Sequence, residues 1–128
     1  MNLQALPEEA LKEILALTEA KKTLDLREKA HDQFMPFAHH VYENFIEGRH
    51  HRVIAEKLEQ VARGELKRLI INMPPRHSKS EFASYLMPAW FLGRNPKLKI
   101  IQATHNTELA VRFGRKVRDL IDDPAYKS

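Results

Sequence analysis

The sequence predicts an α/β fold, in which a helical N-terminal region is followed by strand, loop, helix, strand and helix. Two apolar runs without polar alternation, residues 66–73 and 98–103, are typical of buried parallel strands. The segments after these runs repeat apolar residues at the spacing of an amphipathic helix. A basic, proline-containing loop joins the first strand to its helix, and we expect the functional site there.

Length and composition limit the class of protein. The chain has 128 residues, enough for one domain with a modest core. Its hydrophobic content of 43% and charged content of 30% are typical of a globular chain rather than a disordered one. The lack of cysteine excludes disulfides and thiolate metal sites. No apolar run approaches the length of a membrane span, and the N-terminus lacks a signal-peptide pattern, so we expect no membrane association.

Positive charge is concentrated in the second half of the chain. Residues 1–62 contain 8 Lys or Arg and 11 Asp or Glu, whereas residues 63–118 contain 12 basic and 3 acidic residues. A basic half that coincides with the loop points to a polyanionic partner, either a nucleotide or a nucleic acid. Solvated helix faces explain the same counts and are the commoner reason for them.

The first half of the chain is expected to be helical. Pro7 suits a first helical position and is followed by acidic residues, which predicts a helix over residues 7–31. The later part of this helix has little apolar surface, which fits a solvated extension or an oligomer contact. A short helix including residues 41–45 should follow. Residues 49–63 have the clearest amphipathic pattern, with Gly64 as the stop.

Two helices are predicted in the second half. One opens at Lys79 and should kink or restart at Pro88. Asn106 is the expected N-cap of the other, which has a continuous apolar stripe. Residues 120–124 imitate the end of a Walker B strand, but they continue this basic amphipathic helix, so we reject that reading.

The loop has the layout of a P-loop, in which backbone N–H groups and a helix N-terminus hold a polyphosphate. Lys79 and Ser80 match the end of G-x-x-x-x-G-K-[ST], whereas Met73 and Ser78 occupy the glycine positions. If the turn requires positive φ, Ser78 carries about 1 kcal/mol of strain. Lys79 is expected to reach the β- and γ-phosphates, Ser80 to bind Mg²⁺ and Arg76 to neutralise the transferring phosphoryl group. From the motif alone, a plain basic surface turn stays an equal alternative.

The residues around the loop carry a family resemblance. Residues 64–81 read GELKRLIINMPPRHSKSE, and residues 88–96 read PAWFLGRNP. These segments resemble the large terminase subunits of tailed bacteriophages, one branch of which writes its Walker A loop as P-P-R-H-[GAS]-K-S-E after a G-x-x-K-R-L-I-I strand. The resemblance covers residues 34–126. It implies a helical extension over residues 1–33 and, over residues 34–128, the first part of a P-loop ATPase domain without its Walker B strand or nuclease domain.

The resemblance implies a motor ATPase that packages viral double-stranded DNA with ATP and Mg²⁺. The ATP-binding residues are then Pro75, Arg76, His77, Ser78, Lys79, Ser80 and Glu81. Arg76 and Lys79 are the expected catalytic residues, and the Ser80 hydroxyl is the expected Mg²⁺ ligand. The implied partners are the portal protein, the small terminase subunit and further copies in a ring, in the host cytoplasm and transiently at the procapsid portal. Without the Walker B carboxylates we expect weak nucleotide binding and no turnover by residues 1–128 alone.

A basic face on the last helix is the expected contact with DNA or another subunit. It consists of Arg112, Arg115, Lys116 and Arg118. A solvated helix face is the simpler explanation for these residues. Two other functions stay open: a P-loop ATPase of another kind that acts on nucleic acid, such as a helicase, and a non-catalytic module that binds DNA or a motor subunit.

Aromatic and histidine residues before the loop suggest two further roles. By the resemblance, this region lies on the adenine side of the site, where Phe34, Phe37 or Tyr42 are candidates to stack on a base. Aromatic residues at helical spacing more often belong to a core. The pairs at residues 39–40 and 50–51 are histidines, but no Cys or carboxylate pattern completes a zinc site, so we expect none.

Overall fold

The structure is a computed structural model that describes residues 7–127, and within this range it contains helices and no β-strand. The predicted α/β fold is therefore wrong, and the described chain has an all-α fold. Its helices are α1 (Glu8–Asp32), α2 (Phe34–Val41), α3 (Arg49–Ala62), the π-helix η2 (Glu81–Leu86), α4 (Met87–Arg94), α5 (Thr107–Asp122) and α6 (Pro124–Lys127). None of these helices combines the length and apolarity needed to cross a bilayer.

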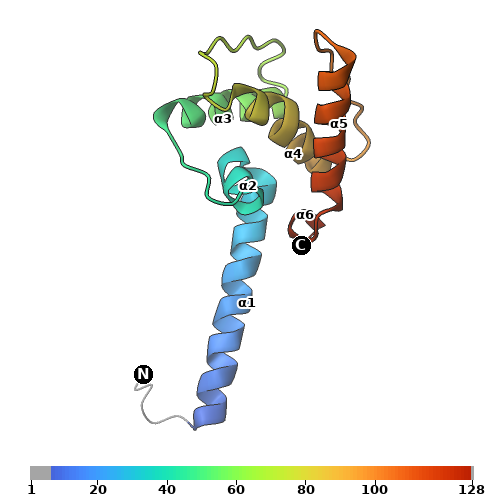
Figure 1. Cartoon of the computed structure of the whole chain (residues 1–128). Helices are drawn as coiled ribbons and strands as arrows, with labels where there is room; N and C mark the ends of the chain where they lie inside the picture. The colour runs from blue at the N-terminus through green and yellow to red at the C-terminus, as the bar shows by residue number, and fades with distance from the viewer. Residues whose placement is uncertain (1–6, 128) are drawn as a thin grey trace.

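The long helix α1 extends away from a body formed by the other helices (Figure 1). Its bounds confirm the helix predicted over residues 7–31. Leu15, Leu17 and Leu24 are each more than half exposed, so most of α1 has no apolar partner in the described chain. Only its C-terminal end joins the body, where Arg94 donates a hydrogen bond to the Asp32 carbonyl at 2.8 Å.

The core lies where α2, α3, η2 and α4 meet. Phe34, Phe82, Leu86 and Trp90 are its largest fully buried side chains. The Phe34 ring centroid lies 5.3 Å from that of Phe82 and 5.5 Å from that of Trp90, both in edge-on contacts. Trp90 Nε1 donates to the Ala30 carbonyl at 3.1 Å. The helix that follows the loop is thus anchored by apolar and aromatic packing rather than by a sheet.

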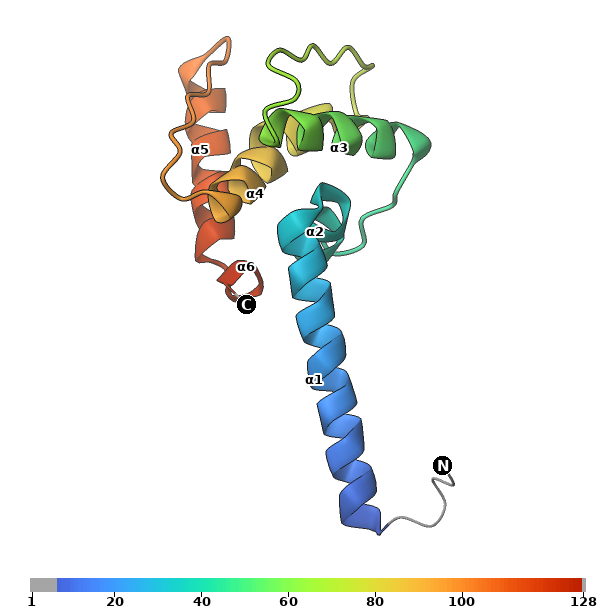
Figure 2. The ribbon, with the colours of Figure 1, turned by 180° about the vertical axis from the view of Figure 1, so that it is seen from behind.

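Both predicted strands, residues 66–73 and 98–103, are irregular segments. Ile70 is 85% exposed and Ile101 is 96% exposed, and no backbone hydrogen bond joins the two segments. A strand needs a neighbour whose N–H and C=O groups complete its ladder, and no other segment of residues 7–127 supplies one. The first segment arches over α3 instead (Figures 1 and 2).

The short helix expected at residues 41–45 is wrong beyond Val41, because α2 runs over Phe34–Val41 and residues 42–45 lie outside it. Pro36 lies in the first turn of α2, where a missing N–H costs nothing. The Phe34 amide donates to Glu59 Oε1 of α3 at 2.8 Å, which supplies a cap from another helix. Tyr42, the C-cap, is extended with φ −117° and ψ 96°, which ends α2 after Val41.

Two predicted helix boundaries are confirmed. At the end of α3, Gly64 has a φ of 76°, and its amide donates to the Val61 carbonyl at 3.0 Å, as in a Schellman motif. At the start of α5, the Asn106 side chain accepts a hydrogen bond from the Leu109 amide at 2.8 Å.

Pro88 widens the helix after the loop rather than ending it. The Met87 amide donates to the Phe82 carbonyl, five residues earlier, which gives the π-helical turn η2. Proline has no amide for the Ser84 carbonyl, four residues before it. That carbonyl accepts instead from Gln102 Nε2 at 2.7 Å. Gln102 thereby ties the irregular segment before α5 to this helix.

Candidate functional site

The candidate site is the turn of residues 73–81, which leads into η2 and includes its first residue, Glu81. Arg76 has a φ of 66° and Ser78 a φ of 59°, so both lie in the left-handed region. Because Ser78 has a positive φ, its backbone is strained at a cost of about 1 kcal/mol. Left-handed residues that alternate with right-handed ones form backbone nests, in which successive N–H groups line an anion-binding concavity.

Five consecutive amides of the turn, those of residues 77–81, have no acceptor within the described chain. The first helical hydrogen bond runs from the Phe82 amide to the Ser78 carbonyl at 2.9 Å, so residues 79–81 form the first helical turn. The positive end of the helix dipole lies at the same place. Free amides and a helix N-terminus together favour an anion here.

The Lys79 side chain extends from the start of the helix back across the turn to the segment before it. Its Nζ donates to the Met73 carbonyl at 3.3 Å, and its side chain is half-buried. His77 Nδ1 lies 3.0 Å from the Pro75 carbonyl, so that nitrogen carries the ring proton. Arg76 is exposed and has no hydrogen-bond or ion-pair partner among residues 7–127. Two cations therefore belong to the turn, one held across it and one free.

Ser80 and Glu81, the last two residues predicted to bind Mg²⁺ and ATP, lie in different surroundings. Ser80 is exposed, and its hydroxyl has no partner in the part of the chain that the structure describes. Glu81 is half-buried, and its carboxylate accepts hydrogen bonds from Lys116 Nζ at 2.9 and 3.1 Å. Ser80 is thus open to a cation, whereas Glu81 is engaged with α5.

Beside the turn, α3 and residues 69–73 enclose an open hollow of about 610 Å³. Arg49, His50 and Lys57 line it together with apolar side chains. Met73, whose carbonyl accepts a hydrogen bond from Lys79, also lines this hollow, so the hollow adjoins the start of the candidate turn. Sequence periodicity missed this hollow, because it is formed by a segment that was expected to lie inside a sheet.

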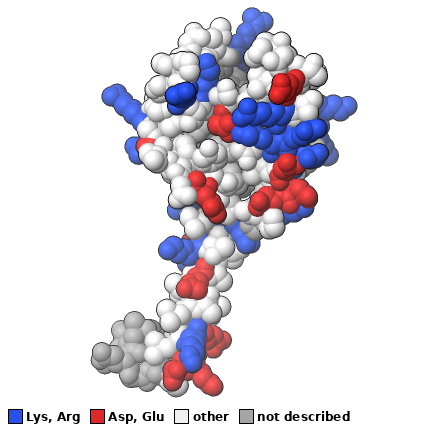
Figure 3. Space-filling view, viewed as in Figure 1, with Lys and Arg blue, Asp and Glu red and all other residues white. Residues whose placement is uncertain are grey.

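The predicted basic face lies on α5, where Lys and Arg atoms gather in Figure 3. Two of its four residues are already paired, since Lys116 bonds Glu81 and Arg118 donates to Asp119 at 2.6 and 2.9 Å. Arg112 and Arg115 are exposed and have no such partner among the described residues. These two arginines are therefore the free cations of the face.

The aromatic candidates for base stacking are mostly in the core. Phe34 is 0% exposed, and Phe37 is 6% exposed and packs against Tyr126 of α6, so neither ring is placed to stack on a base at the turn. Tyr42 is 39% exposed and lies outside α2. The commoner explanation of aromatic residues at helical spacing therefore holds for both phenylalanines.

A contact between histidines joins α3 to the turn, and sequence reasoning missed it. The ring centroids of His50 and His77 lie 5.7 Å apart, and those of His50 and His51 lie 3.8 Å apart. His51 is buried, and its Nδ1 accepts from the Gly48 amide at 2.8 Å. Burial lowers the pKa of His51, and the neighbouring His50 lowers it further. Within residues 7–127, no cluster of three or more His, Cys, Asp or Glu is arranged to hold a metal ion.

Comparison with known proteins adds no relative. No family model, curated protein or solved structure matches the chain. The resemblance to large terminase subunits therefore depends on residues 64–81 and 88–96 themselves.

Proposed function

We propose that the turn of residues 73–81 binds the phosphates of ATP, and that the chain is the ATP-binding part of a DNA-packaging motor ATPase of the terminase kind. The observation that carries this proposal is the run of five amides, residues 77–81, without acceptors in the described chain. It coincides with positive φ at Arg76 and Ser78 and with the start of a helix. A backbone of this kind binds phosphate through N–H groups and a helix dipole.

Lys79 supplies the charge for the β- and γ-phosphates. Its hydrogen bond to the Met73 carbonyl is with a neutral acceptor, which a phosphate oxygen replaces at a gain in electrostatic energy. Arg76 is free to contact the terminal phosphate, and the Ser80 hydroxyl is free to bind Mg²⁺. The hollow beside Met73 has room for the rest of the nucleotide.

We propose that residues 7–127 bind ATP but do not hydrolyse it. Phosphoryl transfer to water requires a carboxylate or amide that orients the attacking water and completes the Mg²⁺ shell. The nearest acidic residue along the chain is Glu81, and it is neutralised by Lys116. Hydrolysis would need a group from elsewhere.

DNA, the portal protein, the small terminase subunit and a ring of further copies are the partners that this proposal includes. The free arginines Arg112 and Arg115 on α5 support a contact with a polyanion. They also support the second candidate function, a non-catalytic module that binds DNA through α5. The remaining alternative, a helicase-like ATPase, would bind ATP through the same turn. The nucleotide-binding prediction therefore applies to it equally.

Calorimetric titration with Mg²⁺ and a non-hydrolysable ATP analogue tests the turn. We expect saturable binding that Lys79→Ala weakens by roughly tenfold to a hundredfold, the effect of losing a charge-assisted hydrogen bond. Lys21→Ala is the matched control, because Lys21 is an exposed lysine of α1 with no partner in the described chain. Equal binding by the parent and Lys79→Ala would contradict the nucleotide proposal.

Anisotropy of labelled duplex DNA tests the second candidate. Replacing Arg112 and Arg115 together by Ala should weaken DNA binding at low salt, because each exposed cation that meets a phosphate releases counterions. The double variant of Lys21 and Lys22 to Ala removes the same charge from α1 and should bind as the parent does. If both double variants lose binding equally, α5 is no specific DNA surface.

A further inference from the structure

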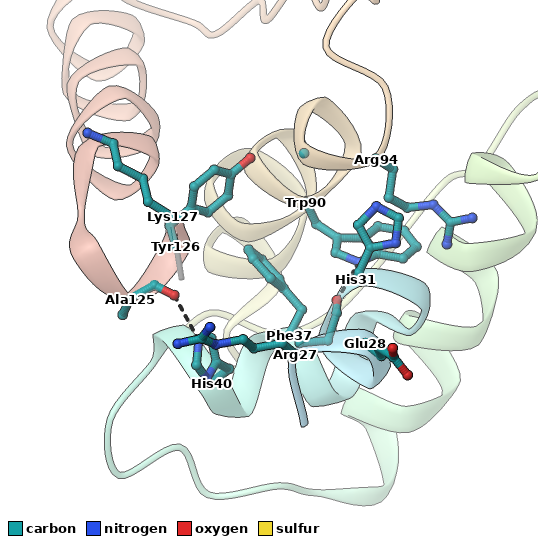
Figure 4. Close-up of a pocket in the computed structure, with 12 residues that line it drawn as sticks. Arg27, Glu28, His31, Phe37, His40, Trp90, Arg94, Ala125, Tyr126 and Lys127 are labelled. Carbon is teal, nitrogen blue, oxygen red and sulfur yellow. Dashed lines mark hydrogen bonds between the residues drawn. The ribbon is translucent and has the colours of Figure 1, made fainter. Parts of the chain in front are cut away.

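A second hollow, of about 410 Å³, lies where α1, α2, α4 and α6 meet (Figure 4). No residue of the candidate turn lines it. Phe37, Trp90 and Tyr126 contribute aromatic walls from three different helices. Its volume falls within the range of small-molecule sites, roughly 300–1,000 Å³.

The polar atoms of these aromatic walls are already paired inside the protein. Trp90 Nε1 donates to the Ala30 carbonyl at 3.1 Å, and the Tyr126 hydroxyl donates to the Ala89 carbonyl at 2.8 Å. The rings therefore offer carbon surface to a ligand and no free N–H or O–H donor. A ligand that covers them needs an apolar body.

The charge at the edge of this hollow is positive and incompletely paired. Arg27 is half-buried, its Nε is buried without a partner, and no acceptor in the described chain bonds its other nitrogens. Arg94 lies over the Trp90 ring with Cζ 4.9 Å from the centroid, and its one hydrogen bond goes to a backbone carbonyl. The carboxylate of Glu28 extends away from the aromatic rings in Figure 4. An apolar hollow with an unpaired guanidinium fits a ligand that is apolar at one end and anionic at the other.

We propose that this hollow binds a small amphipathic carboxylate, with its aliphatic or aromatic body against Phe37, Trp90 and Tyr126. The carboxylate pairs with the terminal nitrogens of Arg27, because the guanidinium fork matches the two carboxylate oxygens. A bare inorganic anion would leave the aromatic walls uncovered, and a neutral apolar molecule would leave Arg27 unpaired. The site is separate from the proposed nucleotide-binding turn, so either proposal stands or fails without the other.

Trp90 is the single tryptophan of the chain and lines the hollow, so its fluorescence reports directly on occupancy. The probe is octanoate, titrated below the concentration at which it forms micelles, and 1-octanol is the neutral match of equal chain length. We expect a saturable change in Trp90 emission with octanoate and binding about tenfold or more weaker with 1-octanol, since the alcohol lacks the charge that pairs with arginine. Equal responses to both molecules, or no saturation with octanoate, would overturn the proposal.

Variants separate the role of Arg27 from a general effect of charge. Arg27→Gln should weaken octanoate binding by about tenfold or more, and Arg27→Lys should recover part of it. Arg112→Gln removes one charge from an exposed arginine on α5 and should bind as the parent does. Amide chemical-shift changes on titration give a second readout that needs no variant, and they should concentrate at α4 and α6. Changes concentrated at residues 73–81, or unaltered affinity of Arg27→Gln, would refute the assignment.

Discussion

Glu81 accepts two hydrogen bonds from Lys116, so a residue predicted to bind ATP is paired with one predicted to bind DNA. The pair joins η2 to α5 across 35 residues of sequence. Lys116 Nζ also lies 5.1 Å from the centroid of the Tyr85 ring. The contact thus links the helix after the candidate turn to the basic helix, and it removes one charge from each proposed surface.

A double-mutant cycle measures this link. The coupling between Glu81→Gln and Lys116→Gln should be about 0.5–1 kcal/mol in urea unfolding at low salt, because both side chains are about a third exposed and solvent screens the pair. High salt should reduce it. The more exposed pair of Arg118 and Asp119 is the comparison and should couple less. Equal coupling in the two pairs would show that the bond between η2 and α5 adds nothing specific.

The strain at Ser78 predicts a stabilising substitution. Ser78→Gly should raise the free energy of unfolding by about 0.5–1 kcal/mol, because relief of the positive φ exceeds the added entropy of the unfolded chain. Ser84→Gly, in the π-helical turn, should lower it by about 1 kcal/mol. Denaturation curves of the two variants decide the matter, since a loss of stability in both would mean that Ser78 is not strained.

The lowered pKa of His51 predicts that the stability of the fold depends on pH. Burial lowers the pKa of His51 in the folded state, the neighbouring His50 and His77 lower it as well, and Glu47 opposes them. The unfolded chain therefore binds a proton on His51 at a higher pH than the folded chain does. The free energy of unfolding should fall as pH decreases below the unfolded value of 6.5 and level off below the folded pKa.

Urea unfolding between about pH 7.5 and pH 5.5 checks this dependence, in the window where histidine titrates. The decline should be smaller in His51→Gln than in the parent. His105→Gln is the control, because His105 is exposed and should leave the decline unchanged. If His51→Gln declines as steeply as the parent, another group is responsible.

Truncation of Phe34 should cause a large loss of stability. This side chain is 0% exposed and contacts the rings of Phe37, Phe82 and Trp90, so Phe34→Ala should cost about 3–5 kcal/mol through lost burial and a cavity. Leu17→Ala, on the exposed part of α1, should change stability by less than about 0.5 kcal/mol. Thermal unfolding followed by circular dichroism compares the two, and similar shifts would mean that the core is elsewhere.

Helix ends could be predicted from the sequence because they depend on local chemistry. Gly64 stops α3 since glycine adopts positive φ at little cost, and Asn106 starts α5 since its side chain reaches an amide three residues on. The rejection of a Walker B strand at residues 120–124 is confirmed for the same reason, because α5 continues to Asp122. The prediction of a short helix at residues 41–45 missed the start of α2 at Phe34, since proline both ends helices and fits their first turn, where Pro36 lies.

By itself, then, the sequence determined α1, α3 and α5, the caps at Gly64 and Asn106 and the condition for strain at Ser78, all of which depend on neighbours along the chain. Tertiary structure alone decided that residues 66–73 and 98–103 form no strand within the described range, because a strand exists only when another segment completes its hydrogen bonds. It also decided that Phe34 belongs to the core and that Glu81 pairs with Lys116. These outcomes depend on residues far apart in sequence, whose meeting no local pattern encodes.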